Sequence, residues 1–378
     1  MNNKLFFLLV LSITFTSCNS GKEEVVSSSF KDYKVIGYIA GWKGVDPEKI
    51  DAEKLTHINY AFANVIDGAV IEGEGRAEQD RENFIKLKSL KDKNPNLKIL
   101  ISIGGWTWSK GFSDAVLTEE SRKKFTDSAI DYLIRHQLDG LDFDWEYPGY
   151  PGDNNVYREE DRENFVLMLK SVREALDSLG KVNNTYYLNT IASGGFKEYV
   201  DVNDLGEVQK YLDFINIMTY DFTGVGNPMT GHHSNLTTAE MDGRSAENAV
   251  IQHVAAGVPI EKLVMGVAFY GKMWKSVNPQ NFGLFQPAKG YRNFPFKDIE
   301  NFLEDENYTK KWDSLSNASF LWNERDSIFV SYESPESILQ KIKFIKNKGM
   351  GGVMFWEYHE DSESRTLLNA IHDCFKRP

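Results

Sequence analysis

The chain has 378 residues, 41% of them hydrophobic, which is enough for one large α/β domain or two small ones with a full core. Its formal net charge is -12, and no stretch is rich in Lys or Arg. This charge argues against nucleic acid or an anionic lipid surface as the main partner.

The first 32 residues are predicted to be a targeting segment and a linker. In residues 1–17, Lys4 precedes an apolar run from Leu5 to Phe15 that is typical of a signal peptide and too short to span a bilayer permanently. Thr16-Ser17-Cys18 then resembles a bacterial lipoprotein processing site, so Cys18 is the predicted lipidation site, and residues 18–32 predict a flexible tether. We expect an outer-membrane or cell-surface lipoprotein of a bacterium. Because Phe15 fits this pattern less well than Leu, plain secretion is the alternative.

Short apolar strands alternate with amphipathic helical stretches along residues 33–378, a pattern typical of a parallel α/β fold. The predicted strands are Val35–Ala40, His57–Ala61, Lys98–Ile103, Gly140–Asp144, Tyr187–Ile191, Phe214–Met218, Val264–Val267 and Gly352–Phe355. Eight such strands predict a closed (β/α)8 TIM barrel, whose active site lies at the C-terminal strand ends.

Three helices have clear apolar faces or end signals. The first two faces comprise Phe125, Ala129, Ile130, Leu133 and Ile134, and then Phe165, Met168, Leu169, Val172, Leu176 and Leu179, with Gly180 as the expected end. Ser334-Pro335 predicts the start of a third helix, and Gly349 its end.

One interval breaks the alternation. About eighty residues separate Val267 from Gly352, which is too long for one loop and one helix. Short runs at Ser319–Trp322 and Ile328–Tyr332 indicate antiparallel strands. We therefore predict a small α+β insertion over residues 271–335, after the seventh barrel strand.

The fourth predicted strand continues into a run of alternating acids. Asp142, Asp144 and Glu146 point to one face, because strand side chains alternate. Carboxylates this close raise one another's pKa, which suits a group that holds a proton near neutral pH and donates it. A solvated edge strand with chance acids is the alternative, and the apolar residues around the acids argue against it.

A divalent metal held by the three carboxylates is a further alternative. No His or additional acid completes a ligand shell at suitable spacing. His232-His233 lies in a loop rich in Gly, Pro and Asn, which predicts a surface or cleft-rim element. We expect neither a metal nor a cofactor.

Other strand ends carry aromatic and polar groups toward the same barrel mouth. They are Gly41-Trp42, Ile103-Gly104-Gly105-Trp106, Met218-Thr219-Tyr220-Asp221 and Met354-Phe355-Trp356. Acids, a phenol and several indoles at one mouth suit a neutral or amide-bearing sugar.

Asp139 to Glu146 matches the pattern Asp-Gly-x-Asp-x-Asp-x-Glu in full, and so resembles the active-site strand of the family 18 glycoside hydrolases, the chitinase family. Ser102-Ile103-Gly104-Gly105, Met218-Thr219-Tyr220-Asp221 and Trp356 resemble further motifs of this family. The resemblance covers roughly Tyr33 to Ala370, and the insertion is similar to that of the chitinases with a deep cleft.

The resemblance implies a substrate-assisted retaining mechanism. Glu146 would protonate the glycosidic oxygen, while the 2-acetamido carbonyl of the substrate attacks the anomeric carbon. Asp144 would stabilise the resulting oxazolinium ion, Asp142 would share a proton with Asp144, and Tyr220 would donate to the acetamido oxygen. The implied substrate-binding residues are Trp356, as the floor, with Asp221, Trp106, Gly105, Tyr147, Met218, Trp42 and Phe62.

The activity implied is that of a chitinase, an endo-hydrolase of β-1,4-linked N-acetylglucosamine polymers. Its partners would be chitin or N-acetylglucosamine oligomers, with a membrane engaged only through the lipid anchor, and a monomer is expected. The alternatives are an endo-β-N-acetylglucosaminidase acting on N-glycans and a non-catalytic chitin-binding lectin. Trp145-Glu146-Tyr147-Pro148 and the insertion favour the chitinase, and the presence of Glu146 argues against the lectin. Endo or exo action stays open.

Overall fold

The computed structural model describes residues 33–376, apart from 74, 225–226 and 240–242. The predicted signal peptide (1–17), the lipidation site Cys18 and the tether (18–32) lie outside the described residues. Among the helices of the described part, none has the length and apolar character needed to cross a bilayer.

Eight parallel strands close into a barrel, which confirms the predicted (β/α)8 fold. The strand order runs β1-β14-β8-β7-β6-β5-β4-β2, and the additional pairing of β1 with β2 closes the barrel. The barrel strands are β1 (Lys34–Ala40), β2 (His57–Ile66), β4 (Lys98–Gly104), β5 (Gly140–Asp144), β6 (Leu188–Gly194), β7 (Phe214–Met218), β8 (Leu263–Ala268) and β14 (Gly352–Trp356).

The predicted strands differ from these mainly at their ends. β2 continues to Ile66, well beyond the predicted end at Ala61, because its last residues pair with the short antiparallel strand β3 (Ala69–Ile71). That hairpin supplies backbone partners that a strand ending at the barrel rim would lack.

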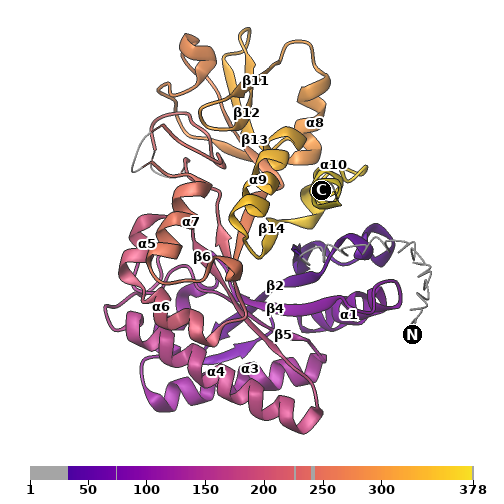
Figure 1. Ribbon diagram of the computed structural model, residues 1–378, viewed down its shortest axis with the longest axis vertical. Helices are drawn as coiled ribbons and strands as arrows, with labels where there is room; N and C mark the ends of the chain where they lie inside the picture. Colours follow the sequence, from indigo (N-terminus) through magenta and orange to yellow (C-terminus); the bar gives the residue numbers. More distant parts are fainter. Residues whose placement is uncertain (1–32, 74, 225–226, 240–242, 377–378) are drawn as a thin grey trace, which may run out of the picture. The chain divides into compact units, whose positions relative to one another are not determined.

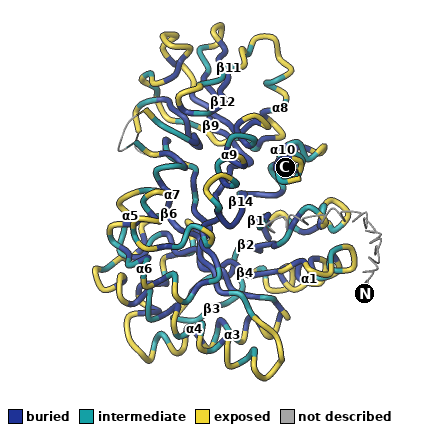
Figure 2. The backbone as a smooth tube through the Cα atoms, viewed as in Figure 1, coloured by how far each residue is buried: buried dark blue, intermediate teal, exposed yellow. Residues whose placement is uncertain are grey.

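Helices surround the barrel and bury one face against it. In the described part they are α1 (Ala77–Ser89), α2 (Phe112–Ala115), α3 (Glu119–His136), α4 (Asp161–Asn183), α5 (Lys197–Val202), α6 (Leu205–Val208), α7 (Ala246–Ala255), α9 (Pro335–Lys348) and α10 (Thr366–Lys376), whereas α8 (Phe296–Glu304) lies with the second sheet (Figure 1). Figure 2 shows the barrel strands as mostly buried, whereas the outer faces of α3 and α4 are exposed. Each fully buried aliphatic or Phe side chain contributes about 1.5–3 kcal/mol.

The predicted helical faces are correct except at two places. Ile134 of α3 is 49% exposed, because it lies at the edge of the apolar stripe that Phe125, Ala129 and Leu133 bury. Gly180 does not end α4, which continues to Asn183. The helix is capped by Asn184 in the left-handed conformation, which Gly adopts most often at this position and Asn sometimes adopts. α9 starts at the predicted Ser334-Pro335 cap and ends at Gly349.

The segment between β8 and β14 forms a second, antiparallel sheet with the strand order β10-β9-β13-β12-β11. Its strands are β9 (Tyr270–Trp274), β10 (Arg292–Pro295), β11 (Thr309–Asp313), β12 (Ala318–Asn323) and β13 (Ile328–Tyr332). Figure 1 shows β11, β12, β13 and α8 gathered away from the barrel strands β2, β4 and β5. Trp274, Trp322 and Phe329 lie in its separate apolar cluster.

His232 and His233 are buried, so the prediction of a surface or cleft-rim element was wrong. The second sheet covers them: His232 Nε2 lies 3.1 Å from Asp313 Oδ2, and the His233 ring packs at 5.2 Å from Tyr270. Local composition predicted a loop, but the burial comes from strands far along the chain.

Candidate active site

A cleft of about 1540 Å³ opens at the C-terminal ends of the barrel strands. It is lined by ten of the residues predicted from the sequence: Trp42, Phe62, Trp106, Asp144, Glu146, Tyr147, Met218, Tyr220, Asp221 and Trp356. The other two predicted residues of the barrel mouth, Asp142 and Gly105, are buried and do not line the cleft. The position of each fits a site role, and the roles themselves stay predictions.

The chain around the acids is held by backbone contacts that need glycine. Gly105 has φ of 80°, its N–H donates to Asp144 O at 2.7 Å, and a Cβ there would come within 2.6 Å of the Phe62 ring. Ser109 Oγ accepts from Glu146 N–H at 2.8 Å and donates to Asp144 O at 3.1 Å. These contacts fix where β5 ends and where the Glu146 side chain enters the cleft.

Asp142 lies below the cleft and accepts four hydrogen bonds. The donors are Tyr38 Oη at 2.8 Å, Ser102 Oγ at 2.9 Å, Thr190 Oγ1 at 2.6 Å and Asn216 Nδ2 at 3.2 Å. Because its oxygens are occupied in this way, no hydrogen bond joins it to Asp144 in the structure. The charge of Asp142 contributes to raising the pKa of Asp144, and the sharing of a proton between the two stays a prediction.

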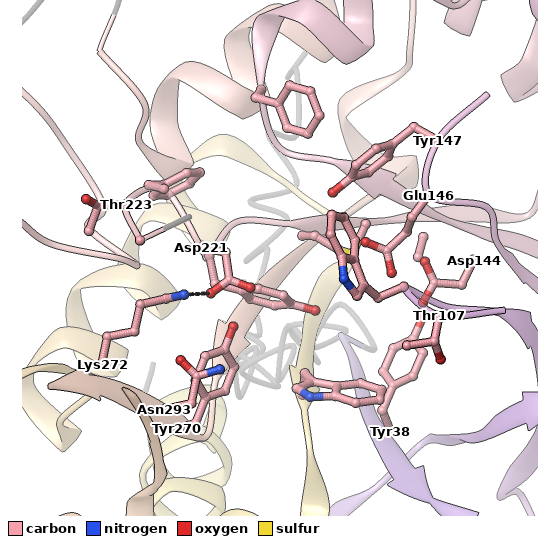
Figure 3. A pocket seen from close by; sticks show the side chains of 18 of the residues that line it. Tyr38, Thr107, Asp144, Glu146, Tyr147, Asp221, Thr223, Tyr270, Lys272 and Asn293 are labelled. Carbon is pink, nitrogen blue, oxygen red and sulfur yellow. Dashed lines mark ion pairs between the residues drawn. The ribbon is translucent and has the colours of Figure 1, made fainter. Parts of the chain in front are cut away.

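Asp144 is buried, and its Oδ1 has no hydrogen-bond partner. Burial raises the pKa of this carboxyl well above its usual range, and the charges of Glu146 and Asp142 raise it further. Burial also raises the pKa of Glu146 to about 8, against an opposing contribution from the Tyr147 hydroxyl. In Figure 3, the Asp144, Glu146 and Tyr147 side chains lie on the same side of the cleft. Glu146 thus holds a proton near neutral pH.

The opposite wall carries a phenol and an ion pair. Burial, followed by the charge of Asp144, keeps the pKa of Tyr220 well above its usual value, so its hydroxyl remains a donor. Lys272 Nζ lies 2.7 Å from Asp221 Oδ1 and is only 2% exposed (Figure 3). The same ammonium lies 4.1 Å from the centre of the Tyr291 ring.

Aromatic rings form much of the remaining lining. The Phe62 and Trp356 rings stack at 5.5 Å with 15° between their planes, and the Trp42 ring lies 6.3 Å from each of them. Trp42 and Trp106 are each 46% exposed, so their faces are open to a ligand. Such rings offer flat apolar surfaces beside the polar groups.

Several cleft residues were not predicted from the sequence. They are Tyr38, Arg76, Tyr150, Phe196, Arg244, Tyr270, Lys272 and Asn293. Tyr38 could have been predicted from strand alternation, which places it on the same face of β1 as Ile36 and Ala40. Lys272 could not, because it comes from β9 of the second sheet and no local motif marks it. Among the described residues, no group of three or more His, Cys, Asp or Glu side chains is placed to hold a metal ion.

Comparison with known proteins gives the family. Residues 34–361 match the model of glycosyl hydrolases family 18. Chitinase A1 of Niallia circulans is 33% identical over 434 residues, which cover 97% of this chain and 62% of that protein, so the chain spans less than two thirds of this relative.

Two solved structures share the fold over 91% of the chain. A family 18 N-acetylglucosaminidase from Paenibacillus barengoltzii has a TM-score of 0.84 and 37% identity, with all of that chain covered. Chitinase ChiA74 from Bacillus thuringiensis has a TM-score of 0.85 and 32% identity, with 69% of that chain covered. The chain therefore belongs to glycosyl hydrolases family 18.

Proposed function

We propose that this protein is a chitinase that hydrolyses β-1,4-linked N-acetylglucosamine chains with retention of configuration. The observation that carries the proposal is the placement of Glu146, protonated at neutral pH, beside Asp144 in an aromatic-lined cleft. Related proteins that bear the name chitinase support the substrate class. Neither the N-glycan endoglycosidase nor the lectin has such support.

In the proposed mechanism, Glu146 donates its proton to the glycosidic oxygen as the bond to the leaving sugar breaks. The acetamido carbonyl oxygen of the same substrate sugar attacks its anomeric carbon, which gives a cyclic oxazolinium ion. Asp144, as a carboxylate, accepts a hydrogen bond from the acetamido N–H and stabilises that cation. Tyr220 donates to the acetamido oxygen, and Trp356 supports the sugar ring. Glu146, now a carboxylate, takes a proton from the water that opens the ring.

A second candidate is an N-acetylglucosaminidase, because one of the similar solved structures carries that name, and we consider it here as an exo-acting enzyme. Timed product analysis separates the two. Purified protein would be incubated with chitin hexamer, colloidal chitin and a high-mannose glycoprotein. An endo-chitinase releases a range of short oligomers early, whereas an exo-enzyme releases monomer from the first time point. Release of glycans from the glycoprotein, with chitin untouched, would contradict both.

Substrate assistance predicts a sharp dependence on the acetamido group. Fully deacetylated oligomers are expected to give no measurable products, because no acetamido oxygen is present to attack the anomeric carbon. A thiazoline analogue of the cyclic intermediate is expected to inhibit competitively. Parallel assays of acetylated and deacetylated hexamers by mass spectrometry check this, and efficient cleavage of the deacetylated hexamer would rule the mechanism out.

The raised pKa of Glu146 predicts an alkaline limit to activity. We expect kcat/KM to fall as the pH rises through about 8, because only the protonated acid can donate. The Asp221 charge contributes to raising this pKa, so Asp221→Asn should lower it and move the limb to lower pH. Profiles of kcat/KM against pH for both proteins check the shift. An alkaline limb that stays in place in the variant would contradict it.

We also propose that Cys18, outside the described residues, carries the lipid anchor. As a tether, roughly ten residues beyond it would give the barrel a reach of about 15–20 Å from a membrane surface. Cys18→Ser is expected to release the protein or leave it unprocessed, and the wild type should incorporate radiolabelled palmitate in a bacterial host. If the wild type takes up no label and its mature N-terminus lies elsewhere, plain secretion replaces the anchor.

A further inference from the structure

Arg76 brings a positive charge to the wall of the cleft. Its guanidinium carbon lies 5.9 Å from the centre of the Trp42 ring and 4.5 Å from the centre of the Trp108 ring. The Trp42 ring in turn lies 6.3 Å from that of Trp356, which supports the cleaved sugar in the proposed mechanism. Arg76 therefore flanks the place of a neighbouring sugar rather than that of the cleaved sugar.

Contacts with the backbone and with one ring fix the position of the guanidinium. Arg76 Nη2 donates to Phe62 O at 3.3 Å. A Cβ on Gly73 would come within 2.5 Å of Arg76 Nε and within 2.4 Å of the Trp108 ring, so only glycine leaves room there. The charge is held between this glycine and the Trp108 ring.

The charge of Arg76 has no direct counter-ion among the residues that the structure describes. Its Nε is buried without a hydrogen-bond partner. Asp80, four residues on, is fully buried, does not line the cleft, and accepts from Tyr60 Oη at 2.5 Å. Glu360 does line the cleft, but it is paired with Lys43 at 3.1 Å. A ligand beside Trp42 therefore meets a positive charge that no adjacent carboxylate neutralises.

The adjoining helix does not explain an arginine at this position. Arg76 is the N-cap residue of α1, and its side chain makes no capping hydrogen bond. Helix N-termini favour Ser, Thr, Asp and Asn as caps and disfavour positive charge. The cation thus gains nothing from the helix, and its exposure to the cleft is the feature that remains to be used.

We propose that Arg76 makes the cleft discriminate against deacetylated, positively charged sugars beside Trp42. The proposal rests on the proposed function for the identity of the polymer. An N-acetylated sugar is neutral, whereas its deacetylated form carries an ammonium group when protonated, and two positive charges a few ångströms apart repel each other. This selectivity differs from the need for an acetamido group at the cleaved sugar, because it acts on another sugar and depends on charge.

The binding test uses fully acetylated and fully deacetylated hexamers, since every register of the deacetylated hexamer places an ammonium group beside Arg76. Dissociation constants would be measured by calorimetry at mildly acidic pH in the full chain carrying Glu146→Gln, so that neither oligomer is consumed. Arg76→Gln removes the charge, and Arg76→Lys keeps it. Arg81→Gln is the matched control, because Arg81 lies on the exposed face of α1 and does not line the cleft.

We expect Arg76→Gln to bind the deacetylated hexamer about threefold to thirtyfold more tightly, with little change for the acetylated hexamer. This gain should shrink between about 0.05 M and about 0.5 M salt, because salt screens the repulsion. Arg76→Lys and Arg81→Gln should keep the original ratio of the two dissociation constants. An unchanged ratio in Arg76→Gln would overturn the proposal. So would an equal, salt-independent loss of affinity for both hexamers, which is the result expected if Arg76 only holds the Trp42 and Trp108 rings.

A second measurement locates the effect relative to the cleaved bond. With Glu146 intact, partially deacetylated polymer would be hydrolysed and the products sequenced by mass spectrometry. Deacetylated sugars should be depleted at a fixed distance from the new chain ends, and Arg76→Gln should abolish this depletion while leaving that at the cleaved sugar. The same pattern in both proteins would contradict the proposal. A wild type that hydrolyses no polymer, while the binding ratio still responds to Arg76→Gln, would count against the proposed function and support the role of Arg76.

Discussion

Replacement of Glu146 by Gln is expected to lower kcat on chitin oligomers by about 10²–10⁴-fold. The amide keeps the size of the side chain and cannot donate a proton to the leaving oxygen. The variant should fold normally, because the contacts that position residue 146 use its backbone: Ser109 Oγ accepts from its N–H, and Asn155 Nδ2 donates to its carbonyl. Steady-state rates on a chitin hexamer, with circular dichroism as a fold check, measure the effect.

The matched control for this prediction is Glu82→Gln, on the exposed face of α1. It makes the same chemical change far from the acids and should retain wild-type kcat. Near-wild-type turnover by Glu146→Gln would remove Glu146 as the acid. Asp144 would then be the next candidate for the acid, because its pKa is also raised well above its usual range.

Replacement of Lys341 by Met is expected to lower the free energy of unfolding by about 3–5 kcal/mol, the cost of leaving a buried charge unpaired. Lys341 of α9 is fully buried and pairs with Glu333, which is 1% exposed. The same ammonium donates to Ser234 O at 2.6 Å. Ser234 Oγ in turn donates to Thr219 O at 3.2 Å, one residue before Tyr220. Urea unfolding at neutral pH, followed by fluorescence, measures the loss.

Lys343→Met provides the control, because Lys343 lies on the exposed face of the same helix. Its effect should stay within about 0.5 kcal/mol. Adding Glu333→Gln to Lys341→Met should recover part of the stability, since it removes the uncompensated carboxylate. If the single and double variants unfold at the same urea concentration, the Glu333 charge is not what makes the loss large.

Much of the barrel could be predicted because its signals are local. The apolar runs of the eight strands, and the cap at Ser334-Pro335, depend on neighbours within a few residues. The alternation of Asp142, Asp144 and Glu146 likewise needs only the two-residue period of a strand. For the same reason the ends were less accurate: whether Gly180 ends a helix depends on what packs around it, and α4 continues past it.

The chain's sequence by itself determined the barrel, the acid strand and the aromatic residues at its mouth. Tertiary structure decided the state of those acids. Asp142 takes its four donors from four other barrel strands, through Tyr38, Ser102, Thr190 and Asn216. Lys272 reaches Asp221 from the second sheet, and the same sheet buries His232 and His233. Burial and charge depend on everything within a few ångströms, whatever its distance along the chain, so local patterns predict where a side chain points but not which protons it keeps.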